Sequence, residues 1–320
     1  MTVTVAIIGL GIMGRRMLQH MGLHGAYQPC ALWDPDPQAC RAAQELAPDA
    51  KISQSAEEAI MAADLVYLAC PPVPRKAYAL AAAAAGKAVF LEKPLGVDIA
   101  QSRELVAGLK AHGVPAAVNF TQAAGPALSG VMEAARSGVM GEMAGVDIVV
   151  TYPAWPRAWQ KEADWLRFRA EGGMTREVIS HFLFCSERVL GPLSVIWAHP
   201  SHPQDRELCE THLLARLETA GGCPVSVMAS VGGAQPDRQE LTFKGSKTSR
   251  RLTDFYVSWV SDGGPFTAID ETDADPRAVA LRAQLDDLLL CMEGKPNRLA
   301  TPEEALRVQV LVETMLAGKA

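Results

Sequence analysis

The chain has 320 residues, of which 49% are hydrophobic and 21% charged, and its formal net charge is −6. This length favours two domains, and the composition is typical of a soluble globular protein with full hydrophobic cores. The acidic balance argues against a broad nucleic-acid surface, which needs clustered excess Lys and Arg. No apolar run approaches the roughly 18 residues that span a bilayer.

The seven cysteines are scattered, odd in number and without a C-x-x-C pair. This pattern indicates neither a disulfide framework nor a zinc site, and each cysteine is expected to be a small buried hydrophobe. The first apolar segment has no basic lead-in, because Arg15 and Arg16 follow it, so no signal peptide is expected. We therefore expect a cytoplasmic protein.

Three glycines, Gly9, Gly11 and Gly14, follow the first apolar run. The pattern predicts a strand, a tight turn and a helix. Gly9 lets the chain turn sharply, Gly11 lets the backbone approach a phosphate, and Gly14 lets the helix pack closely on the strand. The helix N-terminus adds free N–H groups and a partial positive charge. The stretch predicts a dinucleotide site, although glycines also punctuate ordinary turns.

A second predicted strand, residues 28–33, ends at Asp34, twenty residues beyond the last of these glycines. In a dinucleotide fold, a carboxylate here accepts hydrogen bonds from the adenosine ribose hydroxyls. An aspartate before a proline also favours a turn, and Asp34 can both form this turn and bind the ribose. Because a carboxylate repels a 2′-phosphate, Asp34 favours NAD over NADP. Three basic residues could soften that preference: Arg15, Arg16 and Arg41.

Strands and helices alternate through the rest of the first half. We expect helices over residues 15–23, 37–46, 56–62, 75–85 and 99–112, strands over 64–70, 88–91 and 116–118, and a short strand or loop over 52–55. This alternation predicts a doubly wound parallel sheet, in which ligands bind at the carboxyl ends of the strands. Five such ends carry suitable residues: Gly9, Asp34, Cys70 to Pro72, Lys93 and Asn119.

The motif Glu92-Lys93-Pro94 follows the predicted strand 88–91, and Gly86-Lys87 precedes that strand. Together with the G-x-G-x-x-G, the Asp after the second strand and the proline-rich turn after the fourth, this order resembles the Gfo/Idh/MocA oxidoreductase family. The resemblance implies that Lys93 reaches the nicotinamide ribose and the substrate oxygen, and that Pro94 often follows a cis peptide. An ammonium beside a reacting hydroxyl would stabilise developing alkoxide character. The alternative for Lys93 is a solvated surface lysine.

The expected cofactor is NAD, with NADP as the alternative. The residues predicted to bind it are Gly9, Gly11, Ile12, Met13, Gly14, Asp34, Cys70, Pro71, Glu92 and Lys93. Glu92 is expected to brace Lys93 rather than to react.

From about residue 120 the alternation ends. Strands are expected over residues 146–152, 194–198, 211–218, 225–231, 238–243 and 252–257, and helices over 128–137, 278–291 and 302–315. Short, turn-rich connections predict a large open, mainly antiparallel sheet. We therefore expect an α/β protein with a Rossmann domain, residues 1–119, and a substrate-binding and oligomerisation domain, residues 120–320, whose closing helices can pack back on the first. The resemblance implies a sheet face that pairs with another subunit in a homodimer or homotetramer.

The chemical core of the second half is the stretch 172–181. On a helix, Glu177 and His181 share a face, so the carboxylate can orient the ring and stabilise its charged form. Without further context, a Glu and His at this spacing form a surface ion pair as often as a catalytic pair. They could also bind a metal, but a third ligand is not evident. The resemblance implies a proton acceptor at His181. Departures from the family pattern are Glu177 for Asp, Ile179 for a small residue, Met174 for Gly and Thr121 for Arg.

Three of the six tryptophans, Trp155, Trp159 and Trp165, fall within eleven residues and alternate with arginines. Their rings suit the C–H faces of a sugar or cyclitol, and the arginines suit an acidic group. Equally, these rings could pack the domain junction. The residues predicted to contact substrate are Lys93, Asn119, Trp165, Glu177 and His181.

The predicted activity is an NAD(P)-dependent dehydrogenase or reductase. It would move a hydride between nicotinamide and a hydroxyl-bearing carbon of a small polar substrate, such as a sugar, a polyol or a derivative. Lys93, His181 and Glu177 are the predicted catalytic residues. Two alternatives stay open: an NAD-dependent glycoside-cleaving enzyme that works by transient oxidation and elimination, and a non-catalytic NAD-binding regulator. Neither a metal, a nucleic acid nor a membrane is expected as a partner.

Overall fold

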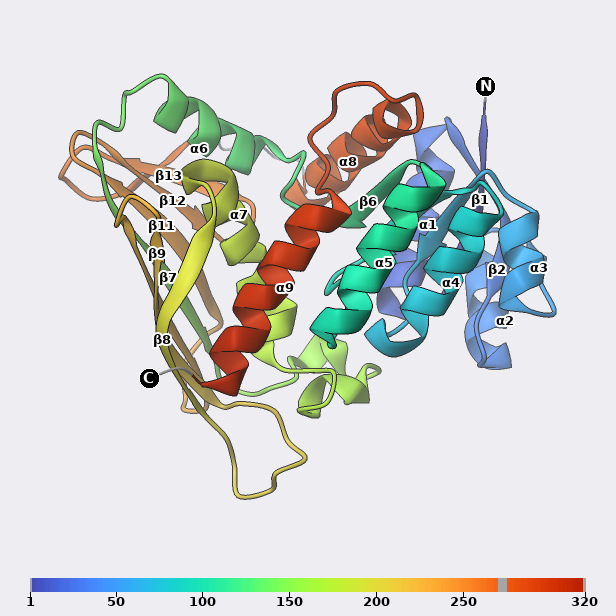
Figure 1. Ribbon diagram of the computed structural model, residues 1–320, viewed down its shortest axis with the longest axis horizontal. Coiled ribbons are helices and arrows are strands. Elements are labelled where there is room, and N and C mark those ends of the chain that lie inside the picture. The colour runs from blue at the N-terminus through green and yellow to red at the C-terminus, as the bar shows by residue number, and fades with distance from the viewer. Residues whose placement is uncertain (1, 270–274, 319–320) are drawn as a thin grey trace. The chain divides into compact units, whose positions relative to one another are not determined.

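The computed structural model describes residues 2–269 and 275–318 and divides into two compact units (Figure 1). The first unit comprises Met1–Phe120 and Leu281–Leu306, and the second comprises Thr121–Ala280 and Arg307–Ala320. Each unit is built on its own sheet. None of the helices in the described ranges has the length and hydrophobicity of a bilayer span.

The sheet of the first unit has six parallel strands in the order β3-β2-β1-β4-β5-β6. They are β1 (Val3–Ile8), β2 (Tyr27–Trp33), β3 (Lys51–Ile52), β4 (Leu65–Leu68), β5 (Ala88–Glu92) and β6 (Ala116–Asn119). The chain starts at β1, runs outward to β3 and then crosses to β4, and this reversal marks the ligand edge of a doubly wound sheet. β4 and β5 are buried along their whole length, which explains their apolar sequences. The predicted parallel sheet is confirmed.

Five helices connect these strands. They are α1 (Ile12–His24), α2 (Pro37–Leu46), α3 (Ala56–Met61), α4 (Pro72–Ala84) and α5 (Ile99–His112). α4 packs against α5 (Figure 1). The prediction of its start at residue 75 was wrong, because Pro72 and Pro74 lie in its first turn. Proline is tolerated there since the first-turn N–H groups have no intrahelical acceptor.

A helix from late in the chain, α8 (Pro276–Met292), contributes to the core of the first unit. Leu281, Leu285 and Leu288 pack in one cluster with side chains of β1 and α1. The Tyr27 hydroxyl donates to the carbonyl of Leu285 at 2.6 Å, and burial raises the pKa of that tyrosine. The Rossmann core is therefore completed by residues more than 250 positions away from its first strands.

The sheet of the second unit has eight strands in the order β14-β13-β12-β11-β7-β10-β9-β8. They are β7 (Met143–Tyr152), β8 (Leu193–Ser201), β9 (His212–Thr219), β10 (Pro224–Val231), β11 (Arg238–Gly245), β12 (Ser249–Thr253), β13 (Val257–Ser261) and β14 (Thr267–Ile269). β7 and β10 pair in parallel, and every other neighbouring pair is antiparallel. The expected large, mainly antiparallel sheet is confirmed.

The strand predicted over residues 252–257 was wrong. β12 ends at Thr253, and Asp254 and Phe255 have left-handed backbone angles, with φ of 50° and 69°. Residues other than glycine rarely adopt this conformation, so the sequence carried no turn signal there. The chain reverses into β13, and the short β14 was likewise not predicted.

The helices of the second unit are α6 (Pro126–Arg136), α7 (Ser180–Leu190) and the part of α9 (Pro302–Ala317) that begins at Arg307, with short 3₁₀ turns at Ala158–Gln160 and Asp164–Arg167. A π-helical turn, Thr175–Ile179, leads directly into α7. A buried ion pair ties this turn to α9, because Arg176 donates to both oxygens of Glu313 at 2.7 and 2.8 Å. Arg176 also donates to the carbonyls of Arg169 and Gly172. The start of α7 is thereby anchored.

Candidate functional site

Two of the three glycines after β1 are required by the protein itself. Gly9 has a φ of +92°, and a Cβ there would lie 2.4 Å from the backbone nitrogen of Cys70. A Cβ on Gly14 would lie 1.9 Å from the carbonyl oxygen of Gly9. Both positions are therefore closed to any side chain, and this contact sets where α1 begins.

Gly11 differs from them, because no protein atom lies within 4 Å of where its Cβ would be. Its φ of −67° is open to any residue. Gly11 is the N-cap of α1, and no side chain caps the first turn, which contains Ile12 and Met13. A helix N-terminus with a bare backbone and open space in front fits a pyrophosphate, which binds free N–H groups and would clash with a Cβ.

Asp34 lies at the end of β2 and is tied to the glycine loop. Its Oδ2 accepts from the backbone N–H of Leu10 at 2.7 Å, and its Oδ1 accepts from the N–H of Asp36 at 2.9 Å. The second bond confirms the turn role. Each carboxylate oxygen can accept a further hydrogen bond, so ribose binding remains a prediction that the geometry allows.

Arg75, in the first half of α4, holds together the turns that follow β4 and β5. Its side chain is 2% exposed. The guanidinium donates to the carbonyl of Cys70 at 2.5 Å, to that of Glu92 at 2.6 Å and to that of Pro94. The Lys93–Pro94 peptide bond is cis, as the resemblance implied. The sequence analysis missed Arg75, which stands among exposed residues at a helix start.

Behind Lys93, which is half-buried, lies a buried polar network. Glu92 accepts hydrogen bonds at Oε1 from the Tyr67 hydroxyl and from the Asn119 amide, the latter at 2.6 Å. Burial raises the pKa of the Glu92 carboxyl. The Glu92 side chain therefore links the ends of β4, β5 and β6, and its role in bracing Lys93 remains a prediction. The side-chain oxygen of Asn119 accepts a hydrogen bond from the amide of Gln284 in α8 at 3.0 Å. Both the oxygen and the nitrogen of the Asn119 side chain therefore have protein partners, and its contact with substrate remains a prediction.

In the second unit, Gln122 orients the ring of His181. Oε1 of Gln122 lies 2.8 Å from Nδ1 of His181, and both side chains are buried. With a carbonyl oxygen facing Nδ1, the neutral ring carries its proton there and leaves Nε2 as a proton acceptor. Phe255, from the left-handed turn after β12, packs edge-on against the ring with centroids 5.4 Å apart. Sequence reasoning missed Gln122, because a buried glutamine three residues after Asn119 carries no motif.

Glu177 lies in the π-helical turn and accepts from the amide of Gln160 at 3.3 Å. The turn is held at its start by Glu210, which accepts from the backbone N–H and the hydroxyl of Thr175 at 2.8 and 2.6 Å. Burial raises the pKa of Glu210. π-Helical turns often occur at functional sites. The predicted role of Glu177 in orienting His181 remains a prediction.

Trp165 lies half-buried in the second 3₁₀ turn. The next residue, Leu166, accepts a hydrogen bond from the indole N–H of Trp155 at 2.9 Å. This bond holds two parts of the tryptophan-rich segment together. Contact of Trp165 with substrate remains a prediction. Within the described ranges, no group of three or more His, Cys, Asp or Glu side chains has the arrangement of a metal site.

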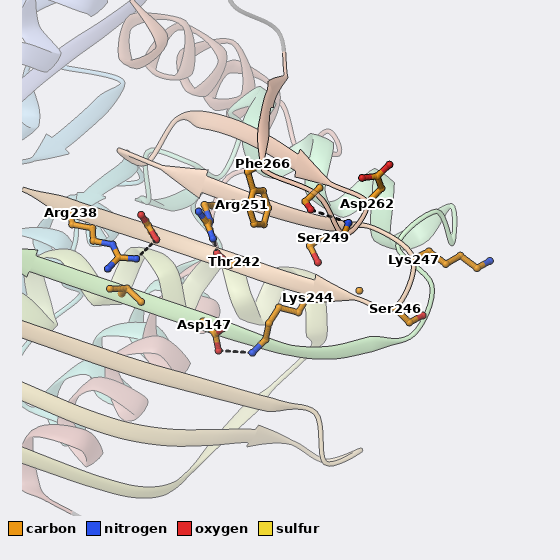
Figure 2. A pocket seen from close by; sticks show the side chains of 15 residues that line it. Asp147, Arg238, Thr242, Lys244, Ser246, Lys247, Ser249, Arg251, Asp262 and Phe266 are labelled. Atoms are coloured by element: carbon orange, nitrogen blue, oxygen red, sulfur yellow. Dashed lines mark hydrogen bonds and ion pairs between the residues drawn. The ribbon is translucent and has the colours of Figure 1, made fainter.

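A separate polar pocket of about 380 Å³ lies on the sheet of the second unit, over β7, β11 and β12 (Figure 2). Its charges are largely paired: Lys244 donates to Asp147, and Arg238 donates to Glu240, each at 2.8 Å (Figure 2). The described residues that line it include none of those predicted to bind cofactor or substrate.

Comparison with known proteins identifies the first unit. Residues 3–120 match the family model "Oxidoreductase family, NAD-binding Rossmann fold", GFO_IDH_MocA. An inositol 2-dehydrogenase of Acidiphilium cryptum is 36% identical over 118 residues, which are 35% of this chain and 35% of that protein. A second inositol 2-dehydrogenase, of Agrobacterium fabrum, is 33% identical over 117 residues, again 35% of each chain. The chain matches about a third of the length of these curated relatives.

Solved structures match over almost the whole chain. The WlbA dehydrogenase of Bordetella pertussis, in complex with NADH and UDP-GlcNAcA, is 20% identical with a TM-score of 0.83, covering 99% of this chain and 96% of that one. KijD10, a 3-ketoreductase of Actinomadura kijaniata in complex with NADP and TDP-benzene, is 21% identical with a TM-score of 0.82, covering 99% and 98%. At these identities the likeness establishes the fold of the second unit as well as the first.

Substituting Gly11 by Ala should weaken NAD binding by about tenfold or more, since a Cβ would stand where the pyrophosphate packs. The free energy of unfolding should change by less than about 1 kcal/mol, the size of an N-cap preference. Calorimetric titration with NAD and denaturant unfolding measure the two quantities.

Gly14→Ala is the matched control. It should lose about 1–3 kcal/mol of stability through overpacking against the Gly9 carbonyl. Unchanged NAD affinity in a folded Gly11→Ala variant would contradict the assignment of the loop.

The loop geometry, the Asp34 tether and the family match all fall within one stretch of the chain. The first unit is an NAD(P)-binding Rossmann domain. Residues 3–120 of the chain match the model of the Gfo/Idh/MocA oxidoreductase family.

Proposed function

We propose that the protein is an NAD-dependent dehydrogenase or reductase that acts on a CH–OH group of a small sugar, polyol or related compound. The observation that carries the proposal is the position of Lys93. It directly follows β5 of an NAD(P)-binding domain, in a turn that Arg75 clamps. A cation held beside a reacting oxygen would stabilise the negative charge that develops there.

In the oxidation direction, Nε2 of His181 would take the proton of the substrate hydroxyl. Gln122 holds the ring in the tautomer that this step needs. The ammonium of Lys93 would stabilise the same oxygen as alkoxide character develops. Glu177 would stabilise the protonated imidazole. When bound, NAD supplies the acceptor for the hydride that leaves the substrate carbon.

The substrate class follows from the relatives. Inositol 2-dehydrogenases match about a third of this chain, and their name specifies a cyclic polyol. The departures at Glu177 and Ile179 lie outside residues 3–120, the range that the family model matches. We therefore propose a carbohydrate-like alcohol without assigning inositol itself.

The preference for NAD over NADP rests on Asp34. Its carboxylate is anchored at the end of β2 by the Leu10 N–H, so it cannot swing away from an incoming 2′-phosphate without losing that bond. Arg15 is committed to the carbonyl of Leu10 at 2.8 Å, which limits its capacity to neutralise such a phosphate.

Lys93→Ala and His181→Ala should each lower kcat by about 10²–10⁴-fold, the range for losing a general acid–base or oxyanion-stabilising group. The affinity for NAD should change by less than about tenfold. Activity is measured at 340 nm over a panel of sugars, polyols and sugar acids with NAD and NADP separately, and NAD affinity is measured by calorimetry.

The matched controls are Lys110→Ala and His112→Ala, both exposed near the end of α5, and they should retain full activity. Wild-type-like kcat in both site variants would sink the proposal. Cleavage of aryl glycosides with no net NADH would instead support the glycoside-cleaving alternative.

We also propose that the open face of the second sheet pairs with a second copy of the chain. Leu214, Met228 and Val149 form a cross-strand row on that face, and the first two are 51% and 39% exposed. Val149 of this row also lines the polar pocket that holds the paired charges. Apolar side chains on a sheet face gain from being covered.

Combining Leu214→Glu with Met228→Glu should convert a dimer or tetramer into a monomer, because like charges would meet across the interface. Sedimentation velocity at micromolar concentration measures this. Leu46→Glu, a similarly exposed leucine of the first unit, is the control and should leave assembly unchanged. A monomeric wild-type protein would refute the proposal.

A further inference from the structure

Arg157 lies in the segment between β7 and the π-helical turn, and its guanidinium is surrounded by a cage of three aromatic rings, those of Tyr152, Trp155 and Trp159. The guanidinium carbon of Arg157 is 5.2 Å from the ring centre of Tyr152, 5.8 Å from that of Trp155 and 4.7 Å from that of Trp159. Such distances allow cation–π attraction to each ring. Arg157 itself is half-buried and Trp159 is 44% exposed, so solvent reaches both of these side chains.

Hydrogen bonds fix the orientation of this arginine. Its Nε donates to Oε1 of Gln160 at 2.9 Å, and the amide of Gln160 in turn donates to Glu177 at 3.3 Å. Gln160 is 2% exposed, so this connection is shielded from solvent. The guanidinium is therefore one buried amide away from a predicted catalytic carboxylate.

Arg157 has no anionic partner among the residues that the structure describes. Arg176 pairs with Glu313, and Arg298 pairs with Asp287. With Nε committed, the two terminal nitrogens of Arg157 present the edge that binds carboxylates and phosphates bidentately.

A second polar group beneath the same cage also lacks a partner. The hydroxyl of Tyr152 is fully buried and makes no hydrogen bond within the described residues. It interacts electrostatically with Arg157 and with the carboxylates of Asp237, Glu177 and Asp254. A buried donor without an acceptor is unfavourable, and this hydroxyl makes the buried side of the cage polar.

We propose that Arg157 is a substrate-recognition residue that binds an acidic group, a carboxylate or a phosphate, on a sugar-like substrate. The rings of Trp155 and Trp159 hold the guanidinium plane and offer apolar faces to the sugar C–H groups. The inference rests on the proposed function and narrows its substrate class to acidic carbohydrates. If the cage were only a means of folding the segment, Arg157 would contribute equally to neutral and acidic compounds.

The test compares matched neutral and acidic probes on the NAD-loaded protein: D-glucose, D-glucuronate and D-glucose 6-phosphate, with the corresponding galactose series. Binding is read from the tryptophan fluorescence that Trp155 and Trp159 report and from calorimetry, and turnover is read at 340 nm. At least one acidic probe should bind about thirtyfold or more tightly than its neutral counterpart. The two acidic arms distinguish a carboxylate from a phosphate.

Arg157→Met keeps the apolar stem against the rings and removes the charge. It should erase the advantage of the acidic probe and leave the neutral probe within about threefold. Arg157→Lys keeps the charge without the planar fork and should recover part of the advantage. Arg167→Met is the control, because Arg167 also stacks on a ring, Phe168, but already pairs with Asp164.

Equal affinity of wild type for neutral and acidic probes, or no binding of any acidic probe at millimolar concentration, would overturn the inference. So would an Arg157→Met variant that loses both kinds of probe equally. Binding of an acidic probe without any reduction of NAD would sink the proposed function while leaving the recognition site intact, so the two failures are distinguishable.

Discussion

The contact between Gly14 and the carbonyl oxygen of Gly9 is the constraint on which the ligand edge of the first unit depends. Because no Cβ fits at either position, α1 begins at the closest possible approach to the turn after β1. The next amide, that of Leu10, is bound by Asp34. The helix N-terminus and the carboxylate are therefore fixed relative to each other, while Gly11 faces open space that a phosphate fits.

A second constraint acts at the neighbouring strand ends. Burying the guanidinium of Arg75 is costly unless its donors find acceptors, and its two terminal nitrogens donate to the carbonyls of Cys70, Glu92 and Pro94. One side chain thereby joins the turns after β4 and β5. Lys93 lies between two of the clamped carbonyls, so its backbone cannot shift without breaking these bonds.

Local patterns predicted the parallel sheet and the strand-end residues such as Asp34, because buried parallel strands and glycine turns leave strong signals in sequence. The residues that orient the candidate catalytic groups were missed. Arg75 and Gln122 act on carbonyls and on His181 through contacts that only the tertiary structure creates. The hairpin at residues 254–255 was missed because its left-handed residues are not glycines.

The most direct test of this account is a crystal structure of the protein grown with NAD. The account predicts the pyrophosphate against the first-turn N–H groups of α1 beside Gly11, the adenosine ribose on the carboxylate of Asp34 and the nicotinamide ribose at Lys93. NAD bound elsewhere, or a ribose that leaves Asp34 uncontacted and extends away from Lys93, would contradict it.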